Sequence, residues 1–185
     1  MALTASNGQP SRDALRPPSS YWFAVWTHSR CEQLVHDQLV GKGFQAYLPT
    51  VKNWSRRAGN QHLIDQPMFP GYLFVNHPMD KYSHVEVLKS RGVVRVLGGR
   101  WDSLVPVPDV EIESLQQVQR AGAAVQPYPH LREGQRVRIE AGPLAGLEGF
   151  LVRSKPQRGL LVLSVDLLRQ SVAVEVDCTV VSPSQ

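Results

Sequence analysis

The sequence predicts an α+β domain, in which helices pack on a mainly antiparallel sheet, followed by a small closed β-barrel. Three observations lead to this prediction. Strand-like aromatic and β-branched segments alternate with two amphipathic segments up to residue 99. The composition changes at Ala121, where Gly, Ala and Pro become frequent. The 55 residues from 131 to 185 then hold short alternating strands separated by turns, which suits a small barrel.

The elements of the first domain follow the order β-α-β-β-β-α-β. The aromatic segment 21–27 predicts a buried strand. Ser29 and Glu32 have the spacing of a capping box, which predicts a helix from Ser29 that ends at Gly41 and Gly43. Further strands are expected at 44–49, at 63–72 after a hairpin tip at Gly59-Asn60, at 72–75 and at 93–97, and helices at 80–90 and 109–118.

The spacing of the apolar residues indicates which of them lie on the same face of each helix. In the first helix Cys31, Leu34, Val35 and Leu39 share one face, and in the second Tyr82, Val85 and Leu88 share one side.

Four segments are expected along the chain. Residues 1–20 have three prolines and no apolar period, which predicts a disordered tail. The first domain spans 21–120, a linker spans 121–130, and the barrel spans 131–185. Barrel strands are indicated by the apolar positions Val137 and Ile139, Phe150 and Val152, Leu161 to Val165, and Val172, Val174 and Val176, and Gly149 lets the next strand pass closely.

The charge pattern points to a polyanionic partner. The net charge is +4. No acid lies between Asp37 and Asp65, or between Glu86 and Asp102, and both stretches carry several basic residues. On one face they would make an electrostatic footprint for nucleic acid, although a merely solvated basic surface explains the charge equally well.

Catalysis and redox chemistry are not expected. The chain has no phosphate-binding loop and no metal-spaced His/Cys cluster, so no cofactor or metal is predicted, and Asp109, Glu111 and Glu113 are expected on a solvated helix. Cys31 and Cys178 are expected to be buried structural thiols. Without a long apolar run or a secretory signal, a soluble cytoplasmic monomer is expected.

The segment Met68-Phe-Pro-Gly-Tyr72 is the most informative motif of the first domain. Pro70 restricts φ and Gly71 permits positive φ, which predicts a tight turn before a strand. The rings of Phe69 and Tyr72 belong either to the core or, beside Trp26, to an exposed aromatic patch that anchors an interface.

Four motifs resemble the NusG family of transcription elongation factors, in the same order. They are Tyr21-Trp-Phe-Ala-Val25, Phe69-Pro-Gly-Tyr-Leu-Phe-Val75, Arg91-Gly-Val93 and the glycine-rich segment Gly134 to Gly149. The resemblance implies a NusG amino-terminal domain followed by a KOW domain, which is an SH3-like β-barrel. The run Tyr72-Leu-Phe-Val75 and the segment 160–165 look closer to specialised paralogues such as RfaH and the UpxY-like antiterminators, which act on particular operons.

The resemblance also implies which residues bind. Trp26, Phe69, Pro70 and Tyr72 match positions that contact the clamp helices of RNA polymerase, and Lys42, Ser90 and Arg91 match a surface that meets the non-template DNA strand. Ser83 and His84 align with a motif that touches the opposite side of the polymerase cleft. In the barrel, Leu144 and Leu147 occupy a turn that implies binding to a ribosomal small-subunit protein or to Rho, and Leu144 replaces an aromatic residue typical of Rho-binding members.

The sequence therefore predicts a non-enzymatic transcription elongation and antitermination factor that binds RNA polymerase and suppresses pausing or termination. The alternative is a ribosome-associated or RNA-binding KOW module, because such barrels also occur in ribosomal proteins. The sequence leaves open the recruiting DNA element, the barrel's partner and whether the barrel refolds as helices, although its alternating valines favour strands.

Overall fold

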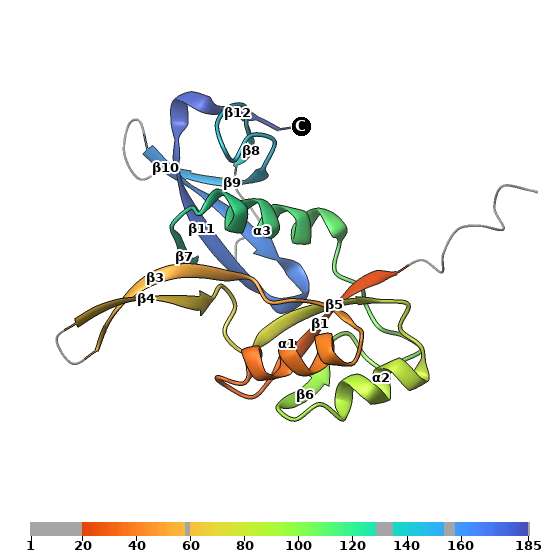
Figure 1. The fold of residues 1–185 in the computed structure, drawn as a ribbon. Helices are drawn as coiled ribbons and strands as arrows, with labels where there is room; N and C mark the ends of the chain where they lie inside the picture. The colour runs from red at the N-terminus through yellow and green to blue at the C-terminus, as the bar shows by residue number, and fades with distance from the viewer. Residues whose placement is uncertain (1–19, 58–59, 129–134, 154–157, 185) are drawn as a thin grey trace, which may run out of the picture.

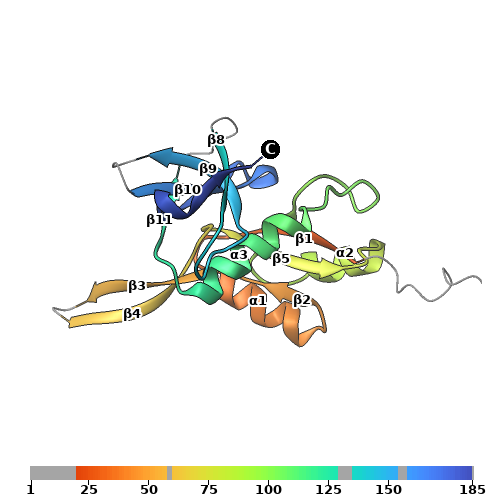
Figure 2. The ribbon, with the colours of Figure 1, turned by 90° about the horizontal axis from the view of Figure 1, so that it is seen from above.

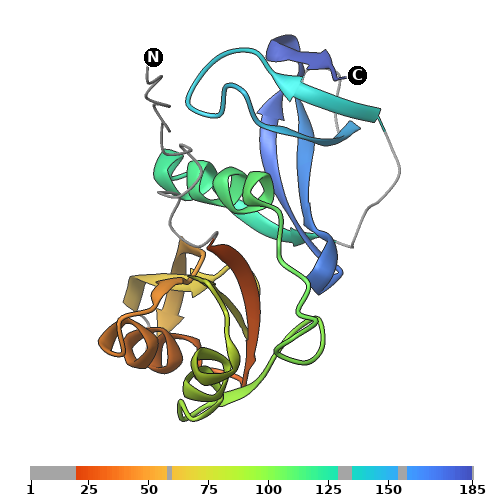
Figure 3. The same cartoon turned by 90° about the vertical axis from the view of Figure 1, so that its right-hand side faces the viewer.

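The computed structural model describes residues 20–57, 60–128, 135–153 and 158–184. They form an α+β part and a β-rich part, with one helix between them (Figures 1 and 3). The predicted α+β fold with antiparallel sheets is confirmed. The tail expected at the amino terminus lies outside the described residues up to Ser19.

The α+β part contains β1 (Tyr21–Thr27), α1 (Glu32–Gly41), β2 (Gln45–Tyr47), β3 (Thr50–Arg57), β4 (Asn60–Pro67), β5 (Tyr72–His77), α2 (Lys81–Leu88) and β6 (Val93–Val96). Helix α3 (Asp109–Ala121) follows. The β-rich part contains β7 (Val125–Tyr128), β8 (Gln135–Ile139), β9 (Glu148–Arg153), β10 (Arg158–Val165), β11 (Gln170–Asp177) and β12 (Val181–Pro183), with 3-10 turns at Asp166–Leu168 and Cys178–Val180.

The first sheet has the strand order β2-β5-β1-β6, and each neighbouring pair is antiparallel. Helices α1 and α2 lie on one side of this sheet and α3 on the other (Figure 1). Because side chains alternate along β1, Phe23 and Val25 join the core with α1 and α2, whereas Trp22 and Ala24 belong to a second core cluster. The sheet is therefore buried on both faces.

Strands β3 and β4 form a separate two-stranded ribbon that extends away from the sheet (Figures 1 and 2). The predicted hairpin is confirmed, but its return strand ends at Pro67 rather than running on to residue 72, and Gly59 at the expected tip lies outside the described residues. The exposed side chains of Trp54 and Leu63 lie opposite each other across the two strands.

The β-rich part is a six-stranded antiparallel sheet with the order β12-β8-β9-β10-β11-β7. Strands β8 to β12 are called the barrel below. The predicted close approach at Gly149 is confirmed, since a Cβ atom there would lie 2.6 Å from the carbonyl oxygen of Val162. The sixth strand, β7, comes from the segment 121–130 that was expected to be a linker.

Helix α3 lies between the two parts (Figure 3). Three of its apolar side chains, Ile112, Leu115 and Val118, are buried in the second core cluster. The same cluster includes Trp22, Met68, Phe69 and Phe74 from the first part and Val137, Leu163, Val165, Leu168 and Val172 from the barrel. A single apolar core therefore passes from the sheet through α3 into the barrel.

Three local expectations are wrong. Helix α1 begins at Glu32 after Cys31 with no side-chain cap, so the capping box of Ser29 and Glu32 does not form. Leu34 is exposed rather than packed with Val35 and Leu39. In α2, Tyr82, Val85 and Leu88 share a side as expected, but it is the solvent side, and Val87 is the buried residue.

The two cysteines were expected to be buried. Cys31 is half-buried, and the side chain of Cys178 lies outside what the structure describes. Among the described residues, no helix is long and apolar enough to cross a membrane.

Candidate functional site

The segment from Phe69 to Tyr72 forms the predicted tight turn. The N–H of Tyr72 donates to the carbonyl oxygen of Phe69 at 3.1 Å, and Gly71 has a φ of 84°. With proline at the second position and a positive φ at the third, the segment has the features of a type II turn, in which glycine avoids the strain of a side chain. The turn fixes the direction in which the chain enters β5.

A buried carboxylate supports this turn. Glu32, at the start of α1, is 6% exposed, and its Oε1 accepts a 2.6 Å hydrogen bond from the N–H of Gly71. The carbonyl oxygen of Gly71 in turn accepts from the N–H of Thr27 at 2.8 Å. The turn is therefore held to both α1 and β1. This role of Glu32 is not visible in the sequence, where its spacing from Ser29 indicates a local capping box.

Two aromatic side chains lie beside the turn, at the end of the sheet. Trp26 and Tyr72 are directly opposite each other across β1 and β5. Trp26 is 37% exposed, Tyr72 is half-buried and Pro70 is exposed. The Arg95 guanidinium lies over the Trp26 ring, 5.1 Å from its centroid, which is within the range of a cation–π interaction. Trp26, Pro70, Tyr72 and Arg95 are called the aromatic–basic surface below.

Phe69 does not belong to the exposed surface, so the expectation that it lies there beside Trp26 is corrected. Its side chain is 1% exposed and packs into the core cluster that the sheet shares with α3 and the barrel. Trp22 and Phe74, on the same face of the sheet, are buried in this cluster too. The apolar face that continues from Trp26 is therefore covered in this arrangement.

The side chains of Lys42 and Ser90 hold the turn after α2. The Lys42 Nζ donates to the carbonyl oxygen of Glu86 at 2.6 Å and to the Ser90 Oγ at 3.1 Å. Ser90 is 3% exposed, so its expected direct contact with DNA is corrected: its hydroxyl is engaged within the protein. Lys42 also lies 3.7 Å from a carboxylate oxygen of Glu86.

Arg91 is held by its backbone and has an exposed side chain. Its N–H donates to the Gln38 Oε1 at 3.0 Å, and its carbonyl oxygen accepts from the Gln38 Nε2 at 3.0 Å. The next residue, Gly92, has a φ of 100°, and a Cβ atom there would lie 2.9 Å from the Cβ of Cys31. This close packing against α1 presents the Arg91 guanidinium to solvent.

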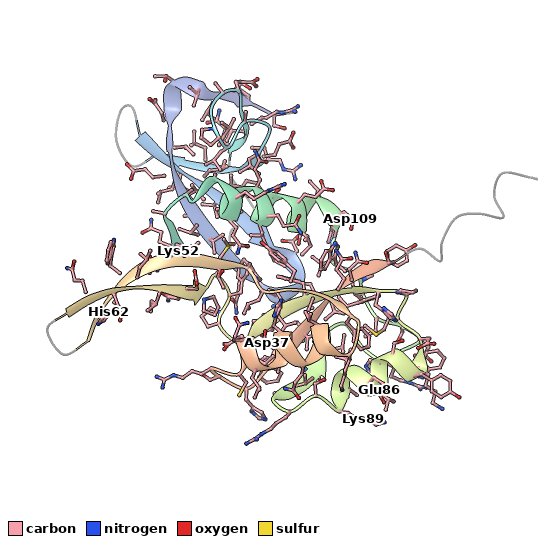
Figure 4. The ribbon with its side chains drawn as sticks, in the orientation of Figure 1. Asp37, Lys52, His62, Glu86, Lys89 and Asp109 are labelled. Carbon is pink, nitrogen blue, oxygen red and sulfur yellow. The ribbon has the colours of Figure 1, made fainter. Side chains whose placement is uncertain are left out.

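Glu86 carries its negative charge next to two lysines. Lys89 donates to the Glu86 Oε1 at 2.7 Å, and Figure 4 labels Glu86 on α2 and Lys89 directly after it. The hydrogen bond from Lys89, followed by the charges of Lys89 and Lys42, lowers the pKa of Glu86. The acid that would repel nucleic acid here is therefore compensated by neighbouring cations.

Ser83 and His84 lie in the first turn of α2 and are half-buried. The N–H of Ser83 donates to the Oδ1 of Asp80, the N-cap residue, at 2.7 Å, and the Ser83 Oγ lies 3.0 Å from the Nε2 of His77. The Ser83 side chain is thus already bonded within the protein, which leaves His84 as the more available member of the expected cleft contact.

The turn between β8 and β9 faces α3. Gln117 on α3 donates to the carbonyl oxygen of Ala145 at 2.8 Å. Leu144 is half-buried against the core cluster, and Leu147 is 2% exposed within it. The expected partner surface is therefore corrected: Leu147 is a core residue, and the turn contacts the chain's own helix.

A groove of about 1190 Å³ lies between α3 and the barrel, lined among others by Glu111, Leu115, Phe150 and Asp166. Burial, followed by the charge of Asp166, raises the pKa of Glu111 to about 7. Its Oε2 is buried without a hydrogen-bond partner among the described residues. The expectation that Glu111 lies on a solvated helix face is wrong, because the barrel covers that face.

The fold and these surfaces define a class of protein: a two-part protein in which an α+β part presents aromatic and basic side chains and is followed by a β-rich part. The family model "Transcription termination factor nusG" matches residues 20–116. The transcription termination/antitermination protein NusG of Vibrio vulnificus is 26% identical over 170 residues, covering 86% of this chain and 93% of that protein. The Neisseria meningitidis NusG is 28% identical over 169 residues, covering 86% and 95%.

A solved structure described as "Domain interaction in Thermotoga maritima NusG" has the same fold. Its TM-score is 0.56 at 18% identity, and the match covers 90% of this chain and 98% of that one. The chain belongs to the NusG family. The members of this family are non-enzymatic transcription factors that work with RNA polymerase, and relatives act in termination and antitermination.

Proposed function

We propose that this chain is a transcription elongation and antitermination factor that binds the clamp helices of RNA polymerase through its aromatic–basic surface. A factor that binds the closed clamp more tightly than the open one shifts the polymerase toward the closed state and so reduces pausing. The protein would act in the cytoplasm, as a specialised member recruited to particular operons.

The observation that carries the proposal is the pair of the exposed Trp26 and the half-buried Tyr72, which lie beside the turn that Glu32 holds. Exposed aromatic and arginine side chains are enriched among residues that dominate binding energy. Here Glu32 holds the turn, and Arg95 is positioned over the Trp26 ring. Little ordering cost remains to be overcome on binding, because both strands and the turn are already fixed.

Phe69 differs from Trp26 and Tyr72 because its side chain is buried. It lies under α3 and the barrel, so it contacts a partner only after these elements leave the sheet. We therefore assign the first contact to Trp26, Pro70 and Tyr72, and the contact of Phe69 to an open arrangement.

The DNA contact is assigned to the exposed Arg91, with Lys42 and Ser90 as positioning residues. Arg95 is opposite Trp26 in the β1–β6 pair, and Arg91 lies in the turn just before β6, so the cations border the aromatic pair. A backbone fixed by Gln38 holds Arg91 in place. This arrangement fits contact with the non-template strand next to the polymerase surface, and His84 would face the opposite side of the cleft.

For the barrel we propose a protein partner, either a ribosomal small-subunit protein or Rho, at the turn that carries Leu144. In this structure Gln117 of α3 donates a hydrogen bond to a carbonyl oxygen of this turn, so the turn faces α3. The partner therefore needs the barrel to separate from α3.

The test is the affinity for core RNA polymerase. The double variant Trp26→Ala, Tyr72→Ala should bind at least 30-fold more weakly, on the basis that each aromatic hot spot contributes about 1 to 2 kcal/mol or more. Trp101→Ala is the matched control, because Trp101 is 40% exposed and lies outside the aromatic–basic surface. Equal affinity of the double variant and the control would refute the proposal and favour an RNA-binding module instead.

A further inference from the structure

The segment between the two parts is itself a strand of the second sheet. Residues Val125 to Tyr128 pair antiparallel with Val174 to Ser171 of β11. Strand β11 also pairs with β10 along its other edge. Strand β7 therefore covers an edge of the barrel that would otherwise present unpaired backbone groups.

The register shows how few hydrogen bonds hold this strand. Pro127 lies opposite Val172 and has no N–H to donate. Because bonded and non-bonded pairs alternate in an antiparallel ladder, the bonding positions of β7 are Gln126 and Tyr128, opposite Ala173 and Ser171. Strand β7 is therefore held at an edge of the sheet by only two bonding positions.

The same strand also contacts the first part. Val125, Gln126 and Val172 line one side of a narrow gap, and the other side is lined by residues at the base of the ribbon and by Met68, next to Phe69. The gap measures about 20 Å³, which leaves room for roughly one water molecule. Strand β7 is thus packed between β11 and the segment that leads into the Phe69 turn.

Helix α3 connects β7 to the covered face of the sheet. It ends at Gly122, whose φ of 63° reverses the chain direction, and β7 begins three residues later. Gln119 in its last turn lies 3.0 Å from the Tyr47 hydroxyl and 3.1 Å from the Thr50 hydroxyl. While β7 is paired, this short connection keeps the barrel directly above the sheet.

We propose that β7 is a releasable strap: its pairing with β11 holds the barrel against α3 and the covered face of the sheet, and its release frees the barrel. The inference rests on the proposed function only where it identifies the covered face as the continuation of the polymerase-binding surface. Once β7 is unpaired, the seven residues 122–128 can extend over up to about 25 Å. The barrel then moves without breaking its own strands β8 to β12.

The test uses the full chain without polymerase. Gln126→Pro removes one of the two bonding N–H groups, and Gln126→Thr keeps it, so the second variant is the matched control. Small-angle X-ray scattering measures whether the parts separate, and hydrogen exchange measures protection in β9, β10 and β11. We expect a larger radius of gyration for Gln126→Pro, faster exchange at Ser171 and Ala173, and unchanged protection in β9 and β10.

Two results would overturn the strap. One is faster exchange at Ser171 and Ala173 with an unchanged radius of gyration, because the barrel would then be held by other contacts. The other is unchanged exchange at both positions, because the pairing would then contribute nothing.

A second variant covers the case in which Gln126→Pro unfolds the barrel. Val125 and Val174 are a non-bonded pair, in which side chains approach closely enough for a disulfide. With Val125→Cys and Val174→Cys, the oxidised variant should keep the compact radius of gyration at a mild denaturant concentration at which the reduced variant separates like the wild type. The single variant Val125→Cys is the control.

Polymerase binding then separates the two proposals. An oxidised variant that stays compact but binds polymerase like the wild type refutes the covered face as a binding surface and leaves the strap intact. An oxidised variant that separates like the reduced one refutes the strap.

Discussion

The Glu32 carboxylate accepts a 2.6 Å hydrogen bond from the N–H of Gly71, 39 residues further along the chain. This contact joins the start of α1 to the turn that precedes β5. Because both groups are buried, loss of the carboxylate would leave the Gly71 N–H without its partner. The position of Tyr72, and with it the aromatic–basic surface, depends on a residue that does not itself belong to that surface.

Removing this carboxylate should weaken both the fold and the surface. We expect Glu32→Ala to lower the free energy of unfolding by about 1.5 to 3 kcal/mol, the range for a hydrogen bond to a charged group. Polymerase affinity should fall as well, because the Tyr72 ring loses its fixed direction. Chemical denaturation and a binding titration measure the two effects.

The conservative variant Glu32→Gln is the control for this prediction. Its amide oxygen still accepts from Gly71, so it should retain most of the affinity that Glu32→Ala loses. If both variants bind equally weakly, the effect arises from the charge and not from the turn.

The close approach of β10 to Gly149 should make the stability of the barrel sensitive to a side chain at this position. In Gly149→Ala the new Cβ lies 2.6 Å from the Val162 carbonyl oxygen, and backbone has to shift. We expect a loss of about 1 to 3 kcal/mol in unfolding free energy, typical of overpacking. Gly41→Ala is the control, because a Cβ atom added there, at the end of α1, would have no neighbour within 4 Å among the described residues.

Arg91 should contribute to DNA binding in a salt-dependent way. For Arg91→Ala we expect weaker association with an elongation complex and a salt slope reduced by about 1, as for the loss of one phosphate contact. Arg100→Ala is the matched control, since Arg100 is exposed and lies 3.4 Å from Asp102. A salt slope equal to that of the wild type would show that Arg91 touches no phosphate.

The contact of Glu111 with the barrel should make stability depend on pH. Burial and the nearby Asp166 raise the pKa of Glu111 to about 7, above the usual 4.5. The protonated form of Glu111 is therefore favoured in the folded state. Its contribution to the free energy of unfolding is fully present below pH 4.5 and is lost as the pH rises through 7. We expect the melting temperature of the wild type to decrease over this interval relative to Glu111→Gln.

The control for the pH dependence is Glu113→Gln on the same helix, because Glu113 is exposed. It should follow the wild-type profile. Identical pH profiles for Glu111→Gln and the wild type would contradict the assignment to Glu111. Arg136 and Glu148, which also line the groove, would then be the groups to examine.

Much of the fold follows from local patterns. The segment Tyr21–Thr27 is predicted as a strand with its observed bounds, because its run of aromatic and β-branched residues suits a buried strand. The Pro70-Gly71 turn and the close approach at Gly149 were also predicted, since each depends on the backbone chemistry of one or two residues.

The features that local patterns do not determine are long-range contacts. Glu32 has the spacing of a capping box, yet its carboxylate is used by Gly71. Phe69 and Leu147 occur in motifs of the binding surfaces, but they are buried because α3 and the barrel pack on the sheet. Strand β7 contains Pro127, which argues against a strand until the edge of β11 is known.

The most direct measurement is site-specific cross-linking from position 26 in a transcribing complex. With a photoreactive phenylalanine derivative in place of Trp26, we predict cross-links to the clamp helices of the largest polymerase subunit, and none there from the same derivative at Trp101. Cross-links from position 26 that map only to RNA or to ribosomal protein would contradict the account.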